Sequence, residues 1–395
     1  SAIPMNFEFS EEQRAIRDAV ARTCSRFGGD YWLHHDRDGG FPHEFHAAIA
    51  ADGWLGIAMP EAHGGSGLGI TEAALMMETI AASGAGFSGA SAVHMNIFGL
   101  HPVVVYASDA QKARWLPPLI AGKDKACFGV TEPGAGLNTP RLTTKAVRDG
   151  DDYVISGQKV WISTAQVANK ILLLARTTPI EETKNPVDGL SLFYADIDRK
   201  TFEARAIDKM GRKAVDSNQV FIDGMRVPVA DRIGDEGKGF RYILDGLNPE
   251  RILVAAEAVG LGRVALQCAA RYAGERIVFD RPIGQNQSIQ HPLAQRWIKR
   301  HSSFTLPSFQ PRTPITSPTS APRPPPASEP CSACRPRQSS RRSARRCTRP
   351  RPRASRARAR SPPGRRTRQR SPARWLSKPS TVPCAGRPAR PPSTR

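Results

Sequence analysis

The feature that most constrains the fold is an abrupt change of composition after Trp297. The chain has 395 residues, with 57 Lys and Arg against 36 Asp and Glu. From residue 301 onward it carries 23 basic residues, one acid (Glu329) and 20 of the 34 prolines. The first 300 residues therefore hold 34 basic and 35 acidic side chains, which nearly balance. Because a segment rich in Arg and Pro cannot bury a core, we expect every folded domain to precede it.

Residues 5–297 are enough for two or three packed domains. Only Cys24, Cys127 and Cys268 lie there, and their wide spacing indicates a reducing compartment rather than a disulfide framework. No unbroken run of about 18 apolar residues is present, so we expect no membrane span. The first residues lack the charged and apolar regions of a secretion signal. The predicted location is cytoplasmic.

Helical patterns fill residues 9–122. Ser10 predicts an N-cap before an apolar stripe with acids early in the run, and further helices are predicted over 71–84 and 108–122. Short β-rich runs follow residue 126, which is typical of a compact antiparallel sheet or barrel. These runs are LTTKAV, YVISG, KVWIS, KILLLA, LSLFYAD and QVFIDG.

A long periodic helix is predicted over 237–274. The predicted fold class is therefore α+β and multidomain. Its parts are an N-terminal α-helical domain (5–123), a middle β-barrel or sheet domain (124–236), the first part of a C-terminal helical bundle (237–297) and a disordered basic tail (298–395).

Four stretches, in this order, resemble the acyl-CoA dehydrogenase family. They are GIAMPEAHGGSGLG (56–69), CFGVTEPGAGLNTP (127–140), MGRKAVDSNQVFIDGMRVP (210–228) and YAGERIVFDRPIGQNQSIQHPLA (272–294). The resemblance covers about residues 5–297. It implies an FAD cofactor, an acyl-CoA substrate oxidised to a trans-2-enoyl-CoA, an acceptor like electron-transfer flavoprotein, and a homodimer or homotetramer. No metal site is expected.

The stretch 127–140 is similar to the family's flavin and substrate loop. The resemblance implies that Phe128, Val130 and Thr131 line the isoalloxazine. It implies that Gly136, on the flavin side, and Leu137 border the thioester. Leu137 stands where many relatives carry Ser, so one hydrogen bond to the substrate's carrier arm would be absent. An ordinary Gly-Pro turn between domains is the alternative.

The run KVWIS ends a predicted strand with a large aromatic residue. The resemblance places Trp161 against one flavin face and the Ser163 hydroxyl near flavin N5, with Ile162 between them in the same cofactor-binding strand. The alternative is that Trp161 is simply a core residue of a buried strand.

The run LNPERILVAAEAVG carries the candidate base. Asn248 predicts an N-cap and Pro249 the first helical position, so Glu250 would lie in the first turn. An acid there complements the helix dipole by about 0.3–1 kcal/mol. Alternatively Glu250 is the catalytic base, as its resemblance to isovaleryl- and long-chain-type acyl-CoA dehydrogenases implies. Glu257, about 10 Å further along the same helix face, is the weaker candidate.

The α-proton of a thioester is only weakly acidic, so the base must meet it within hydrogen-bond reach in a dry pocket. In the family, a flavin ribityl hydroxyl and a backbone N–H stabilise the enolate, and flavin N5 accepts the β-hydride. Asn248 and Arg251 are expected to border the acyl-CoA. For Arg251 a structural salt bridge is the alternative.

Arg276, Phe279 and Gln287 match family positions that cross a dimer interface to the neighbour's FAD. An Arg suits phosphate through its planar fork, although Arg276 can also be a solvated helix-end residue. Asp280 replaces the usual Gly, and Gly274 stands where a helix former would be expected.

The family continues past residue 294 with more helices, whereas here Arg, Pro, Ser and Ala follow. Shifting the reading frame of 298–310 and of 373–383 by two bases yields helix-like patterns in both. We therefore predict a frameshift near residue 298, which would cost the chain its last helices and part of its flavin site. Poor FAD binding and aggregation would follow, and activity could be lost. Sequencing the coding DNA tests this.

The alternative is a functional basic arm. Its charge would bind phosphate backbones nonspecifically, making the chain a nucleic-acid-binding protein on an inactive dehydrogenase scaffold. Cys331 and Cys334 have no second pair at zinc-knuckle spacing, so a metal site is not expected there.

Overall fold

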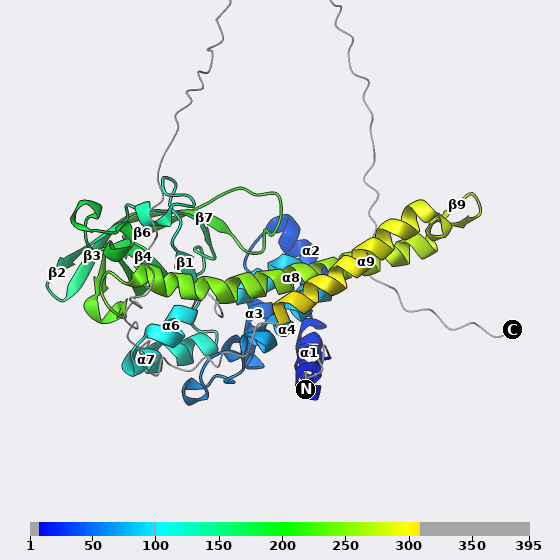
Figure 1. The fold of residues 1–395 in the computed structure, drawn as a ribbon, viewed down its shortest axis with the longest axis horizontal. Helices are drawn as coiled ribbons and strands as arrows, with labels where there is room; N and C mark the ends of the chain where they lie inside the picture. Colours follow the sequence, from blue (N-terminus) through cyan, green and yellow to red (C-terminus); the bar gives the residue numbers. More distant parts are fainter. Residues whose placement is uncertain (1–7, 96, 98–99, 309–395) are drawn as a thin grey trace, which may run out of the picture. The chain divides into compact units, whose positions relative to one another are not determined.

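The computed structural model describes residues 8–95, 97 and 100–308. A helical part, a β-sheet and two long helices follow one another along the chain (Figure 1). This order confirms the predicted fold class. The predicted tail lies outside the described residues from 309 on, so the frameshift and the basic arm stay predictions.

Capping side chains begin two of the N-terminal helices as the sequence predicts. The Ser10 and Ser108 hydroxyls each accept a hydrogen bond from the backbone N–H three residues on. The helix predicted over 71–84 begins at Ile70 and runs into a π-helical turn that contains Gly84 at φ 103°. The seven α-helices of this part are α1 (Glu11–Cys24), α2 (Gly29–Asp38), α3 (His43–Ala51), α4 (Ile70–Ile80), α5 (Gly86–His94), α6 (His101–Tyr106) and α7 (Asp109–Ile120).

The middle part is one mixed sheet in the order β6-β7-β3-β2-β4-β5-β8, with β1 beside β4. Its pairs are antiparallel except that β1 and β2 run parallel to β4. Central β4 is buried along nearly its whole length. The strands are β1 (Ala126–Gly129), β2 (Lys145–Asp149), β3 (Asp152–Ser163), β4 (Lys170–Arg176), β5 (Leu190–Asp196), β6 (Phe202–Ala206), β7 (Ser217–Pro228) and β8 (Arg232–Ile233).

Helix α8 (Gly239–Glu275) is a single helix of 37 residues. At 1.5 Å per residue it is about 55 Å long. The prediction that a helix begins at Asn248 is wrong. Asn248 and Pro249, the predicted N-cap and first helical position, both lie inside α8. Buried residues on both sides of Pro249 carry the helix through, although a proline removes one backbone hydrogen bond. Glu250 is therefore not in a first turn, and the dipole explanation for it does not hold.

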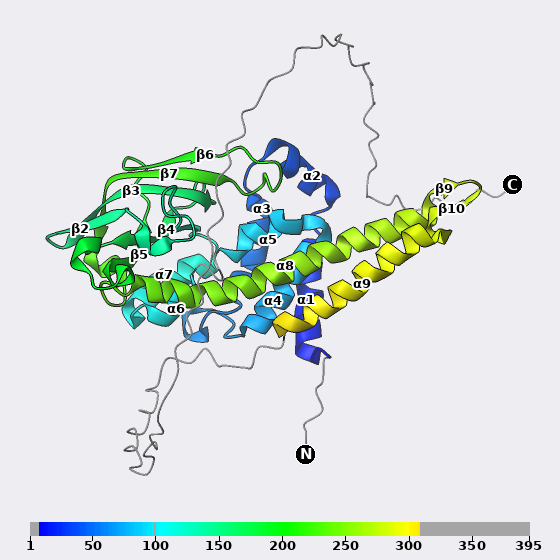
Figure 2. The same cartoon turned by 45° about the horizontal axis from the view of Figure 1, so that its top comes forward.

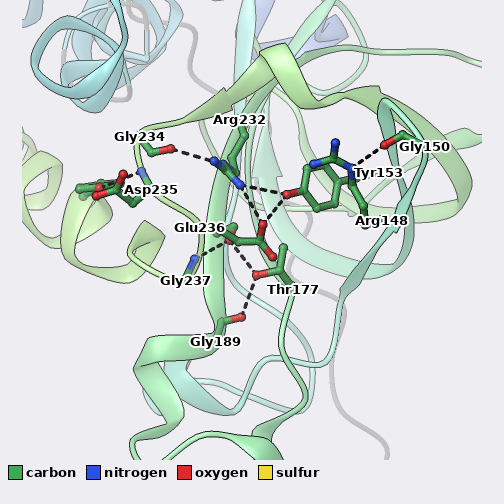
Figure 3. Close-up of polar contacts among 12 residues, drawn as sticks. Arg148, Gly150, Tyr153, Thr177, Gly189, Arg232, Gly234, Asp235, Glu236 and Gly237 are labelled. Carbon is green, nitrogen blue, oxygen red and sulfur yellow. Dashed lines mark hydrogen bonds and ion pairs between the residues drawn. The ribbon is translucent and has the colours of Figure 1, made fainter.

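A polar cluster fixes the point where the sheet leads into α8 (Figure 3). The Glu236 carboxylate accepts hydrogen bonds from the Tyr153 hydroxyl at 2.7 Å and from Arg232 Nη1 at 2.8 Å. Gly237 has φ 78°, and its N–H donates to Ser191 Oγ at 2.8 Å. A Cβ at Gly237 would lie 2.3 Å from the Asp188 carbonyl oxygen, so only glycine fits this turn. The direction of α8 is thus set by the sheet.

The start of α8 packs on the sheet and α6 through Tyr242 and Ile243. Its middle packs along α4, where Ile252, Leu253 and Ala256 belong to the core of the N-terminal helices. Beyond Gly260 the helix runs beside α9 (Gln287–Ser308) to the small hairpin of β9 (Ile277–Val278) and β10 (Arg281–Pro282), as Figure 2 shows. Helix α9 thus extends into the segment predicted as tail. By length and composition α8 could cross a membrane, but the completely buried Glu257 and the packing on α4 are typical of a core helix.

Gly260 is the point of closest approach between α8 and α4. A Cβ there would lie 2.2 Å from the Glu78 carbonyl oxygen, whereas a Cβ at Gly262 would meet nothing within 4 Å. We expect Gly260→Ala to lower the free energy of unfolding by about 1–3 kcal/mol, because the helices must separate. Gly262→Ala should raise it by about 0.5–1 kcal/mol, because alanine favours the helix. Urea denaturation measures both; equal shifts in the two variants would contradict this packing.

Candidate active site

The predicted flavin loop leaves β1 beside the helical part. Phe128 is half-buried and packs against both the helical core and the core between helices and sheet. Val130 is buried, whereas the Thr131 side chain is exposed. Gly136 has φ 47°, and Leu137 is fully exposed. The loop therefore offers a hydroxyl, a glycine turn and an apolar side chain to a ligand.

A β-bulge in β3 exposes the side chain of Trp161. The β3–β7 register shifts between Lys159 and Ile162, and Trp161 has a left-handed φ of 63°. Its side chain is 63% exposed, so the alternative that Trp161 is a core residue is wrong. The neighbouring Ile162 side chain is buried in the sheet's core, so only its backbone can face a ligand. An exposed indole held in a strained backbone is typical of a binding site.

A buried ion pair anchors the loop to β3. Lys159 is completely buried, and its Nζ lies 3.0 Å from Glu132 Oε1 and 2.8 Å from the Leu174 carbonyl oxygen. The backbone N–H groups of Thr143 and Thr144 donate to the Glu132 carboxylate at 2.6 and 2.9 Å. Neither charged residue was predicted from the sequence. Lys159 opens the predicted strand run KVWIS, where a charged side chain could have indicated it, whereas Glu132 lies in the loop and has no such local signal.

The ionisation of this pair follows from its contacts. Burial would raise the pKa of Glu132, but the Lys159 charge and the donors from Thr143 and Thr144 outweigh it and lower the pKa to about 2. Burial lowers the pKa of Lys159 to about 8 against the attraction of Glu132. The loop is therefore held by an ionised carboxylate.

Arg212 joins the sheet to the helices near Ser163. Its guanidinium donates to Ser91 Oγ on α5 at 2.9 Å and to Ser163 Oγ at the end of β3 at 3.3 Å. Burial lowers the pKa of Arg212, while the carboxylates of Glu257 and Asp216 raise it. The strand that carries Trp161 and Ser163 thus lies next to α5.

Three titratable residues gather where α5 meets α8. His94 Nδ1 lies 2.8 Å from Glu257 Oε1, and Glu257 is completely buried. Glu250 is only half-buried. Burial raises the pKa of Glu250, and Glu257 adds to the rise, whereas His94 and Arg251 oppose it. Of the two candidate bases, Glu250 has the accessible carboxylate and the raised basicity that proton abstraction needs.

The predicted substrate residues beside Glu250 lie on the surface of α8. Asn248 and Arg251 are exposed, and Arg251 Nη1 donates to Asn248 Oδ1 at 2.9 Å. Arg251 makes no carboxylate ion pair within 4 Å among the described residues. Both polar groups are therefore available to a ligand.

The remaining predicted cofactor residues lie at the far end of α8. Arg276 directly follows the helix, Phe279 is 93% exposed in the β9–β10 hairpin, and Gln287 begins α9. About 27 Å of α8, from Glu257 to Glu275, separates them from the part of the helix that faces α5 and Arg212. The structure does not bring them to the loop within one chain, and their predicted contact with a second subunit stays a prediction.

The residues around Trp161 suit a planar cofactor. The exposed Trp161 ring and the half-buried Ser163 hydroxyl lie on β3, and the exposed Thr131 hydroxyl lies in the loop after β1. Val160 N–H on β3 donates to the Thr131 carbonyl at 2.9 Å and holds this loop beside the strand. Aromatic rings stack on planar ligands and hydroxyls bond their polar edges. The arrangement fits the isoalloxazine of FAD.

Known proteins are similar to this chain over most of its described residues. Three family models match in order. They are the acyl-CoA dehydrogenase N-terminal domain over residues 10–123, the middle domain over 127–225 and the C-terminal domain over 237–305. Acyl-CoA dehydrogenase FadE12 of Mycobacterium bovis is 38% identical over 294 residues, which is 74% of each chain. The long-chain specific mitochondrial enzyme of Sus scrofa is 31% identical over 304 residues, covering 75% of this chain and 68% of that protein.

Solved structures agree as well. A probable acyl-CoA dehydrogenase from Mycobacterium abscessus has a TM-score of 0.71 at 32% identity, covering 75% of this chain and 78% of the other. A glutaryl-coenzyme A dehydrogenase in complex with glutaryl-CoA has a TM-score of 0.72 at 27% identity, with 77% and 78% covered. The chain belongs to the acyl-CoA dehydrogenase family, whose members are FAD-dependent oxidoreductases that act on CH–CH bonds.

Proposed function

We propose that this chain catalyses α,β-dehydrogenation of an acyl-CoA thioester with Glu250 as the base. The observation that supports this best is the position of Glu250. Its half-buried carboxylate has a raised pKa and lies near His94 of α5, and Arg212 connects α5 to the end of the strand that carries the exposed Trp161. When bound, FAD supplies the hydride acceptor for the β-carbon. The chain's own residues bind the substrate, exclude water and take the α-proton.

Glu250 performs the proton transfer in this proposal. Burial raises the pKa of its carboxylate, which makes the ionised form a stronger base toward the weakly acidic α-proton. Asn248 and Arg251, exposed beside it on α8, hold the polar part of the thioester's carrier arm. Leu137 offers an apolar surface at the loop but no hydrogen bond.

The second half of α8 supports an oligomer. From Leu261 to Tyr272 its residues are exposed or half-buried, and Trp297 and Ile298 on α9 are more than half exposed. A second copy covering these faces would also bring its own Arg276, Phe279 and Gln287 to the flavin. We infer a homodimer or a homotetramer built from dimers, with electrons leaving to an electron-transfer flavoprotein-like acceptor.

Cys24 and Cys127 are buried free thiols. Reduced cysteines are typical of intracellular proteins, and we infer a cytoplasmic location.

Anaerobic mixing of the FAD-loaded full chain with acyl-CoAs of different length tests the function. We expect the visible absorption of the oxidised flavin to bleach with at least one saturated acyl-CoA, with formation of a 2-enoyl-CoA. A chain that binds FAD but is bleached by no acyl-CoA, while dithionite still reduces it, would contradict the proposal.

The basic tail favours a second candidate function. After residue 300 its 23 basic residues face one acid, a composition that binds phosphate backbones in a salt-dependent way. Comparing the full chain with one ended at residue 297 tests whether DNA binding and FAD binding separate. If the frameshift prediction holds, FAD binding by the full chain should be weak.

A further inference from the structure

Glu250 lies near a buried His–Glu pair on α5 and α8. Glu257 is 0% exposed, and its Oε1 lies 2.8 Å from His94 Nδ1. Glu250 precedes Glu257 by seven residues, so both project from the same face of α8. Helix α5, which carries His94, packs on this face. The pair is therefore built into the wall next to the base.

Charges of both signs act on this wall from three elements. Glu250 is influenced by His94 from α5 and by Arg251 and Glu257 from α8. Glu257 in turn faces Arg212 from the segment before β7, and Arg212 also faces Asp216. Because Glu257 and His94 are buried, each of them acts more strongly on its neighbours than it would at the surface.

Glu257 is poorly explained as a stabilising residue. Its Oε2 has no hydrogen-bond partner among the described residues, although the side chain is completely buried. Burying a carboxylate that is only partly satisfied costs folding free energy, and an amide or apolar side chain would fill the place more cheaply. The charge itself is therefore the property that needs an explanation.

We propose that the His94–Glu257 pair is a positioning element for the base, Glu250. The pair fixes the charge near Glu250 and thereby sets the pH range in which Glu250 takes up a proton. This rests on the proposed function, in which Glu250 removes the α-proton. The two members act in opposite directions: the Glu257 carboxylate favours the protonated Glu250, and a protonated His94 favours the ionised one. Neither residue needs to touch the substrate.

Carbodiimide labelling of Glu250 tests the proposal without depending on FAD. The reagent adds to the protonated carboxyl, and an added amine such as glycine ethyl ester then displaces the urea to leave an amide. Trypsin cleavage after Arg241, Arg251 and Arg263 places Glu250 and Glu257 on different peptides, so mass spectrometry follows each separately. The labelling rate of Glu250 against pH gives its protonation midpoint in the full chain.

Opposite shifts are expected from the two single variants. Glu257→Gln should move the Glu250 midpoint to lower pH, and His94→Gln should move it to higher pH, each by about one unit or less. The double variant, in which two amides can bond each other, should return close to the original midpoint. The acid limb of acyl-CoA-dependent flavin reduction should move in the same directions.

Glu78→Gln is the matched control, because Glu78 is an equally buried carboxylate that forms its ion pairs with Arg17 and Arg263. It should leave the Glu250 midpoint in place. Unchanged midpoints in both single variants, or shifts in the same direction, would overturn the proposal, and circular dichroism identifies any variant that fails to fold. If a single variant does not fold, the other single variant and the double variant still give a sign. Absence of flavin bleaching in the unmodified chain would instead count against the proposed function, since the labelling midpoints are read independently.

Discussion

Replacing Glu250 by Gln should slow the reduction of the flavin by acyl-CoA about 10²–10⁴-fold. The amide keeps the size of the side chain but cannot accept the α-proton. Because Glu250 is only half-buried and lies in an unbroken part of α8, the substitution should leave folding and FAD content unchanged. Stopped-flow absorption of the FAD-loaded variant measures the rate.

Glu275→Gln provides the control for this variant. Glu275 is the last residue of the same helix and is exposed, so the same chemical change there should not alter the rate. Exchange of the substrate's α-hydrogen in D₂O, followed by mass spectrometry, isolates proton removal from the later steps. If Glu250→Gln exchanges the hydrogen as fast as the unmodified chain, Glu250 is not the base.

The largest loss of stability should come from Glu132→Gln. The change leaves the Lys159 ammonium in a completely buried place without its carboxylate. Removing one partner of a buried ion pair costs about 3–5 kcal/mol. Urea denaturation of the FAD-free chain should show this loss. FAD affinity should fall as well, because the loop bearing Thr131 and Gly136 is no longer tied to β3.

Two further variants test whether the loss of stability is specific to the buried Glu132–Lys159 pair. Glu203→Gln breaks an exposed pair with Arg205 on β6 and should have no measurable effect. Glu132→Gln combined with Lys159→Met removes both charges and should recover most of the stability. The contribution of Glu132 also has a pH signature. Its folded pKa of about 2 lies below the ordinary 4.5, so the stability is present above about pH 4.5 and is lost as the pH falls toward 2. An equal loss of stability in Glu132→Gln, in Glu203→Gln and in the double variant would contradict this account.

Local signals in the sequence predicted most of the fold. Ser10 and Ser108 carry caps whose geometry depends only on neighbouring residues, and their helices were confirmed. The runs KILLLA and LSLFYAD became β4 and β5, because strands this apolar are stable only inside a sheet. The short strands β1, β6 and β8 were missed. Their residues gain strand structure from pairing with neighbours distant in sequence, which no local pattern shows.

At the site, too, local sequence signals were predictable and contacts between distant segments were not. Asn248 and Pro249 have the local chemistry of a helix start, yet burial of Ile243 and Ile252 on either side carries α8 straight through them. The candidate base could be named from its run of residues. Its surroundings could not, because His94 and Arg212 approach from α5 and from the segment before β7.

Phe128 gives the folded chain a thermodynamic property of its own. Its ring contacts the apolar interior of the helices and also the interior shared between helices and sheet. Two interiors that share a side chain cannot be exposed to water one at a time without cost, so helices and strands should lose their structure together in one cooperative transition.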